Sequence, residues 1–279
     1  MSNNATIEQW EIFQVGTRKS DQTVSERIRV LQQFEIDTGV DPTHALPIDI
    51  VRWYRSHRDV WGPSTLYTYH SYLKTWFKWL QLQDIRLDDP MLKVGTVKQP
   101  KRKPRPVADE HLITLLGVNM MHRTRVMILL AALSGMRCIE ISKFRGDHID
   151  LPRGRILVLG KGGDEEWVPI HPVLATTAET MPARGYWFVS NATRPGQHVR
   201  AKSVSQIVGD AFRRANVPGS AHPLRAWYAT TLLADGADVR TVQELMRQSS
   251  LANTQKYLLA SEENKRAAIN KLDLYRAVA

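Results

Sequence analysis

The sequence has a single cysteine, Cys138, and no run of about 18 apolar residues. We therefore expect no internal disulfide, no zinc site built from several cysteines and no membrane-spanning helix. The amino terminus, "MSNNATIEQWEIF", lacks the charged and then apolar pattern of a secretory signal, which predicts a cytoplasmic protein. There is no GxxxxGK[ST] phosphate loop and no compact cluster of carboxylates or histidines, so we expect no cofactor and no bound metal.

The sequence has fewer acidic than basic residues: 28 Asp and Glu against 38 Lys and Arg give a net charge of +10 and a pI near 9.8. This excess favours a polyanionic partner, and nucleic acid is the leading candidate. An anionic membrane surface is less favoured, because no lipidation signal and no long basic amphipathic helix is present. The 279 residues, 43% of them hydrophobic, suffice for roughly two globular domains.

A basic segment with three prolines, residues 96–108 ("TVKQPKRKPRPVA"), divides the chain. Prolines prevent a continuous helix and like charges keep the segment extended, so it is predicted to link an N-terminal domain, residues 1–95, to a second domain, residues 109–279. A solvated tether is the simplest role. The segment also suits DNA phosphates through its five cations, Lys98, Lys101, Arg102, Lys103 and Arg105.

The N-terminal domain is predicted to be small and all-α. Residues 23–40 carry apolar side chains at helical spacing, which predicts a helix that ends near Gly39. A second helix is predicted within residues 63–83, with Ser64 as its candidate N-cap. In the second helix the expected core residues are Leu66, Leu73, Phe77 and Leu80, and the residues expected on other sides are His70, Lys74 and Lys78. Lys74 and Lys78 suit a helix lying near DNA, although solvated lysines are equally common on any surface helix.

The second domain is predicted to be mostly helical with one β-hairpin. Residues 109–119 and 123–135 have helical patterns, and the latter is apolar almost all round and therefore buried. Residues 154–172 alternate and break at glycines, which indicates an antiparallel hairpin, and the pattern is helical again from residue 201. The predicted fold class is mainly α, with two domains and a small antiparallel sheet.

Four polar features of the second domain are candidates for a functional site. Arg137 in "LSGMRCIEISKF" lies beside buried sequence and needs an anionic partner, which Glu140 three residues on could be. Lys161 lies at the predicted hairpin tip. The other features are His222 with Arg225 in "HPLRAWYATTLL", three apart at the start of a helix, and the lone Tyr257 in "MRQSSLANTQKYL". Each has an ordinary structural explanation by itself: an ion pair, a solvent-exposed lysine, a hydrogen-bonded histidine, a half-buried ring.

Taken together, the stretches "SGMRCIE", "GKGG", "HPLR", "MRQSS" and "TQKYL" resemble the tyrosine recombinases, also called phage integrases. That family has a "TGxRxxE" stretch, a "GKG" hairpin, an "HxLR" motif, an "LGHSS" motif and a tyrosine nine residues beyond its histidine. The order and the separations here are similar, and the resemblance covers the whole chain.

One departure from the family pattern is clear. Where the family usually has glycine and histidine, this chain has Arg247 and Gln248. The Gln248 amide can donate a hydrogen bond to a phosphate oxygen but cannot carry charge or move a proton. Arg247 either adds a phosphate contact or distorts the turn that leads to Tyr257.

The resemblance implies a role for each remaining residue. Arg137 and Arg225 would stabilise the charge that builds on phosphorus, with Glu140 supporting them. His222 would take the proton of Tyr257 as this nucleophile attacks, and Lys161 would protonate the leaving 5′ oxygen. The product would be a 3′-phosphotyrosyl bond formed without metal or ATP.

The resemblance also implies the partners. These are double-stranded DNA with short inverted core sites and, on synapsed DNA, three further copies of a chain that is monomeric when free. In the family the tail after the tyrosine packs on a neighbouring protomer; here its apolar residues, Ala267, Ile269, Leu272 and Tyr275, would equally suit packing in cis. A place in the bacterial nucleoid follows, and the action of an accessory directionality factor is left open.

The expected function is therefore integration or excision of a phage or another mobile element. A Xer-like chromosome-dimer resolvase is the alternative within the family, and the irregular "MRQ" favours the integrase only weakly. The chain has no room before "TIEQWEIF" for an arm-type DNA-binding domain, which fits both. A type IB topoisomerase-like enzyme is disfavoured by the helical N-terminal domain and the tail, and a catalytically impaired DNA-binding relative is supported only by Gln248.

Overall fold

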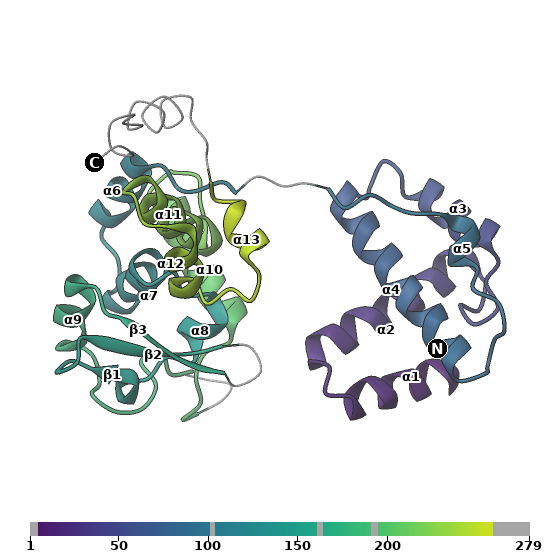
Figure 1. Ribbon diagram of the computed structural model, residues 1–279, viewed down its shortest axis with the longest axis horizontal. Helices are drawn as coiled ribbons and strands as arrows, with labels where there is room; N and C mark the ends of the chain where they lie inside the picture. Colours follow the sequence, from purple (N-terminus) through teal and green to yellow (C-terminus); the bar gives the residue numbers. More distant parts are fainter. Residues whose placement is uncertain (1–4, 101–103, 161–163, 191–194, 259–279) are drawn as a thin grey trace, which may run out of the picture. The chain divides into compact units, whose positions relative to one another are not determined.

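A computed structural model describes residues 5–100, 104–160, 164–190 and 195–258. The chain divides into two compact units, Met1–Arg102 and Lys103–Ala279, so the division lies within residues 96–108 (Figure 1). Within the described ranges, no helix combines the length and the apolar character needed to cross a membrane.

The described part of the N-terminal unit contains five helices. They are α1 (Ala5–Gly16), α2 (Asp21–Thr38), α3 (Pro47–Ser56), α4 (Pro63–Leu82) and α5 (Met91–Val94). The expected end of α2 is confirmed, because Gly39 adopts the left-handed conformation (φ 70°) that glycine tolerates best. The expectation that Ser64 caps α4 is wrong: Gly62 is the N-cap and Pro63 is the first helical residue, where its missing N–H costs nothing.

The side of α4 that packs inward is dominated by aromatic rings. Leu73, Trp76, Phe77 and Leu80 are fully buried, and the rings of Trp76 and Trp10 of α1 lie 5.1 Å apart. Leu66 is only half-buried. The expectation for His70 is wrong, since this ring is buried and its Nδ1 lies 3.2 Å from the hydroxyl of Tyr54. The hydroxyl of half-buried Tyr54 satisfies the histidine and lets it join the core.

The second unit is mostly helical with a small sheet, which confirms the predicted fold class. Its elements are α6 (Asp109–Gly117), α7 (His122–Leu133), α8 (Cys138–Ser142), the 3₁₀ turn η1 (Gly146–His148), β1 (Ile149–Asp150), β2 (Arg155–Leu159), β3 (Glu165–Pro169), α9 (Pro172–Ala178), α10 (Ala201–Arg214), α11 (Ala221–Ala234), α12 (Val239–Leu245) and α13 (Leu251–Gln255). The three strands are antiparallel in the order β1, β2, β3.

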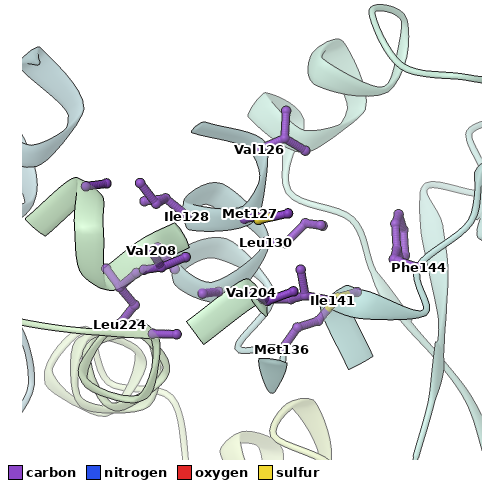
Figure 2. Close-up of a cluster of buried hydrophobic side chains, with 14 of the residues drawn as sticks. Val126, Met127, Ile128, Leu130, Met136, Ile141, Phe144, Val204, Val208 and Leu224 are labelled. Atoms are coloured by element: carbon purple, nitrogen blue, oxygen red, sulfur yellow. The ribbon is translucent and has the colours of Figure 1, made fainter. Parts of the chain in front are cut away.

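Helix α7 is the centre of this unit, as its apolar sequence predicts. Figure 2 shows its residues Val126, Met127, Ile128 and Leu130 among side chains from the helices around it. Those neighbours include Ile141 of α8, Val208 of α10 and Leu224 of α11, all fully buried. Burial of each such side chain contributes roughly 1.5–3 kcal/mol, so the positions of α8 and α11 are fixed by the core.

The predicted hairpin is confirmed. Strand β2 pairs with β3 in a register that sets Leu157 opposite Trp167, while Ile156, Val158 and Val168 face the core. Gly160 donates a backbone hydrogen bond of 2.7 Å to the Asp164 carbonyl and narrows the end of the hairpin. The tip, residues 161–163, lies outside the described residues.

Gly135 makes the turn after α7 and has two reasons to be glycine. Its φ of 58° is left-handed, and an added Cβ would lie 2.6 Å from Cδ1 of Tyr228 and 3.1 Å from the sulfur of Met246. The ring of Tyr228 therefore fills the space that any other residue would need. This turn leads directly to Arg137.

We expect Gly135→Ala to lower the free energy of unfolding by about 2 kcal/mol or more, since left-handed strain and overpacking add. Denaturant unfolding would measure the change. Gly117→Ala is the matched control, because an added Cβ there would meet nothing within 4 Å and its φ is not left-handed, so its stability should be close to that of the unsubstituted chain. A Gly135→Ala variant as stable as this control would contradict the explanation.

Candidate active site

Glu140 and Arg137 form a closed pair at the start of α8. The Glu140 carboxylate accepts the Arg137 backbone N–H at 2.9 Å and the Arg137 Nη1 at 2.7 Å. The side chain of Glu140 is 1% exposed, whereas that of Arg137 is 43% exposed. The ion pair considered from the sequence is thus present, and the outer edge of the guanidinium stays open to an anionic ligand.

Arg225 lies one turn into α11 and is buried. Its Nη1 donates to the Gly135 carbonyl and its Nη2 to the Met246 carbonyl, at 2.5 Å for the second bond. A guanidinium has five N–H groups, so three remain for other partners. Burial and the charge of Arg137 lower the pKa of Arg225 to about 9, which leaves it charged at neutral pH.

His222 precedes Arg225 by one helical turn. Desolvation lowers the pKa of this imidazole, and the positive charges of Arg225 and Arg137 lower it further. The ordinary histidine pKa is about 6.5, so His222 is neutral at pH 7 and can accept a proton. The influence of both arginines on the ring indicates that the three side chains share one region.

Tyr257 follows α13 and is buried, with 7% of its surface exposed. It belongs to a small apolar cluster with Ala226 and Ala229 of α11 and with Val242 and Met246 of α12 and its C-cap. Its phenol lies near enough to Arg225 to raise the pKa of that guanidinium slightly against the lowering by burial. Tyr257 is therefore near Arg225, on the side of the site that α12 and α13 build.

Three hydrogen bonds to neighbouring residues of the chain hold Gln248 in place. Its backbone N–H donates to the Gln243 carbonyl at 3.1 Å, and its carbonyl accepts from Gln243 Nε2 at 2.8 Å. Its side-chain oxygen accepts from the Thr254 hydroxyl at 3.0 Å. The Nε2 amide is then the part of this side chain left to donate to a phosphate.

Arg247 belongs to the arginine cluster around Glu140, a place that the sequence analysis did not predict for it. Its side chain is 4% exposed and its Nη2 lies 3.2 Å from the Glu140 carboxylate. The sequence signal is an arginine at the family's glycine position, where a DNA contact is one of the two expectations. A DNA contact by Arg247 stays a prediction, and the structure points the side chain inward.

The remaining residues singled out in the sequence, for DNA binding, catalysis or packing of the tail, fall into two groups. Lys74 and Lys78 of α4, with Lys98 and Arg105, are exposed. Outside the described residues lie Lys101, Arg102, Lys103, Lys161 and the tail residues Ala267, Ile269, Leu272 and Tyr275. The end of the predicted linker packs on the second unit, because Val107 is buried and donates to the Pro223 carbonyl at 3.3 Å.

Among the residues that the structure describes, no three His, Cys, Asp or Glu side chains are grouped to hold a metal ion. The expectation that no cofactor is needed stays a prediction. What the described residues offer is fixed positive charge: three guanidiniums beside one carboxylate.

The Glu140 carboxylate is charged because its partners outweigh its burial. Burial raises its pKa, but the charge of Arg247, the two hydrogen bonds from Arg137 and the charge of Arg225 bring the pKa below the ordinary value. A lowered pKa means that the ionised form stabilises the folded state above the unfolded-state value of about 4.3, and that this contribution is lost as pH falls through the folded-state value.

We expect Glu140→Gln to destabilise the fold by about 3 kcal/mol at pH 7, since it leaves buried arginines without their counter-charge. Unfolding should be measured by denaturant at pH 7 and again at decreasing pH below about 4.5. The difference between the two proteins should shrink at acid pH, where the unsubstituted carboxylate is itself protonated. Glu179→Gln, on an exposed carboxylate, is the control. A pH-independent difference would show that shape, not charge, is responsible.

The chain matches the family model described as "Phage integrase family" over residues 110–264, which is more than half of its length. Among curated proteins it is 32% identical to the tyrosine recombinase XerA of Thermococcus kodakarensis over 196 residues, which cover 67% of this chain and 70% of the relative.

Solved structures give the same family. The integrase from mycobacterium phage Brujita is 38% identical, with 97% of this chain and 93% of that chain covered and a TM-score of 0.51. A lambda integrase fragment, solved as a dimer bound to a COC' core site, has a TM-score of 0.73 at 17% identity, with 92% of this chain and 95% of that chain covered, and shares the fold. The buried carboxylate with its arginines, the histidine and the tyrosine thus occur in a chain that belongs to the phage integrase family, the tyrosine recombinases.

Proposed function

We propose that this chain cleaves and rejoins DNA at specific sites through a 3′-phosphotyrosyl intermediate, and that it integrates and excises a phage or another mobile element. The observation that carries the proposal is that Arg137 and Arg225 share one buried carboxylate, Glu140. His222 lies near both arginines, and Tyr257 lies near Arg225. A protein that only bound DNA would need the positive charge but not the neutral histidine and the phenol beside it.

The arginines would stabilise the transition state. When an oxygen attacks phosphorus, extra negative charge builds on the non-bridging oxygens, and fixed donors that face it lower the barrier. Arg225 is held by two carbonyls with three N–H groups to spare, and Arg137 is held by Glu140 with its outer edge exposed. Planar forks suit this task better than lysine, because each offers two parallel hydrogen bonds.

The chemistry balances with two proton transfers. The Tyr257 oxygen forms a bond to phosphorus while the bond to the 5′ oxygen breaks, and the phenol proton passes to neutral His222. The 5′ oxygen takes a proton from Lys161, a role that rests on the family resemblance alone. Since the new phosphotyrosyl ester keeps the energy of the diester, a 5′-hydroxyl from a partner duplex can reverse the step.

The partners are proposed on the same basis. Exposed Lys74, Lys78, Lys98 and Arg105 are suited to phosphates, and the lambda integrase structure is bound to a core site. We expect this chain to bind double-stranded DNA with short inverted core sites, as a monomer that forms a homotetramer on synapsed DNA within the nucleoid, with or without a directionality factor.

A Xer-like resolvase is the second candidate, and the likeness to XerA supports it. The likeness to a phage integrase is closer and covers nearly the whole chain, so integration is preferred. Joining two different attachment sites would support the integrase, whereas resolving a plasmid dimer with two identical sites would support the resolvase. Relaxation of supercoiled DNA without strand exchange would indicate a topoisomerase.

Incubation with DNA flanking the gene, followed by denaturing electrophoresis and peptide mass analysis, should reveal a covalent adduct on Tyr257. Tyr257→Phe should abolish it, because the ring remains but the nucleophilic oxygen is gone. Tyr186→Phe, on a half-buried ring that stacks with Arg145, is the matched control and should form the adduct normally. No adduct on DNA that the protein binds would favour a binding-only relative.

His222 should give the reaction a pH dependence. Because its pKa is below the ordinary value, the rate of adduct formation at subsaturating DNA should be flat near pH 7 and fall as the imidazole is protonated, below about pH 6.5. His222→Gln should slow the reaction by about 100-fold and remove this acid limb. An acid limb that persists in the variant would mean that another group is the base.

A further inference from the structure

Arg247 has a backbone conformation that disfavours its own side chain. Its φ is 51°, in the left-handed region, at the end of α12 where its N–H donates to the Glu244 carbonyl at 2.8 Å. For a residue with a side chain this conformation costs about 1–2 kcal/mol compared with a right-handed one. Glycine would make the same turn without that cost, so contacts of the side chain must offset it.

Those contacts lead inward to the other side of the site. Nη1 donates to the Leu245 carbonyl at 2.8 Å, and Nη2 lies 3.3 Å from the carbonyls of Ser134 and Gly135 and 3.2 Å from Glu140. One guanidinium thereby connects the turn after α12 to the turn after α7 and to α8. Its Nε is buried without a hydrogen-bond partner within the described residues. Burying an unpaired donor costs free energy, which the other contacts of the guanidinium must offset.

The same guanidinium is coupled to Arg225. Both use the Gly135 carbonyl, and both lie near the Glu140 carboxylate, Arg247 at 3.2 Å and Arg225 at 4.0 Å. Arg225 is also held by the carbonyl of Met246, the residue directly before Arg247. Movement of the turn at 246–248 would therefore move an acceptor that fixes Arg225.

Charge gives Arg247 a second effect. The side chain next to it, Gln248, is neutral, and it is fixed through its oxygen to Thr254. Arg247 is the charged group of this turn, and it lies 3.2 Å from the Glu140 carboxylate, whose pKa its charge lowers. A guanidinium does not depend on a titratable ring for its charge at neutral pH, whereas an imidazole does.

We infer that Arg247 is a positioning residue of the strand-cleavage reaction. It fastens the turn that carries Gln248 to the turn and helix that carry Arg137, keeps Arg225 aligned through Met246, and supplies a permanent positive charge beside the neutral Gln248. This inference rests on the proposed function for its effect on rate, but the fastening itself is a property of the free protein.

The rate test compares Arg247→Asn with the matched control Arg125→Met. Asparagine tolerates the left-handed conformation but lacks the charge and the reach. Arg125 is a half-buried arginine of α7 whose Nη1 donates to the Leu116 carbonyl at 2.8 Å, away from the site. With single-turnover adduct formation at saturating DNA, Arg247→Asn should be slowed by about 100-fold and Arg125→Met should not be slowed.

The dissociation constant for DNA should change much less than the rate in Arg247→Asn. A loss confined to that constant would overturn the inference, because it would make Arg247 a simple DNA contact. Arg247→Lys restores the charge but not the planar fork, so its rate should lie between those of Arg247→Asn and the unsubstituted protein. A lysine variant no faster than the asparagine variant would overturn the role given to charge.

Hydrogen exchange of the free protein separates this inference from the proposed function. In Arg247→Asn the amides of residues 246–258 should exchange faster, including that of Gln248, while Arg125→Met should leave them unchanged. Unchanged exchange in Arg247→Asn would overturn the fastening even if the unsubstituted protein cleaves DNA. Faster exchange would support it even if no adduct forms on DNA that the protein binds.

Discussion

The buried carboxylate of Glu140 is the interaction on which the rest of the site depends. Two buried arginines, with the partly exposed Arg137 beside them, cannot lie side by side unless a negative charge offsets their repulsion. Glu140 supplies that charge from the first turn of α8, with the Arg137 backbone as a further donor. Three guanidiniums and one carboxylate leave the site with a net charge of +2, which attracts an anion that enters the site.

The carboxylate acts through a scaffold that the hydrophobic core holds in place. Helix α7 fixes both α8, which carries Glu140, and α11, which carries His222 and Arg225. The turn at Gly135 then presents a carbonyl to Arg225 under the ring of Tyr228. The packing of the core thus determines where the charged side chains lie. A change that shifts α7 also shifts the arginines, so stability and activity should be linked.

Much of this arrangement was predictable from the sequence, and the misses have physical reasons. Periodicity identified the buried α7 and the hairpin, and the Arg137 to Glu140 pair followed from spacing along a helix. His70 was misplaced because a buried histidine depends on the Tyr54 hydroxyl, a partner that helical periodicity does not reveal. The inward course of Arg247 was missed for the same kind of reason: its partners, Ser134 and Glu140, are more than 100 residues away in the sequence.

Arg247 and Gln248 together show how the turn after α12 can carry a positive charge at position 247 when the side chain at position 248 is neutral. A titratable ring at position 248 would carry charge only below its own pKa, and a glycine at 247 would make the turn without strain. This chain instead accepts left-handed strain at Arg247 and places a permanent charge against Glu140. Because the charged group is a guanidinium, the charge of this turn does not rest on an imidazole that titrates near neutral pH. The pH dependence of the site then falls to the groups that move protons, among them His222, whose pKa is lowered by burial and further by the two arginines beside it.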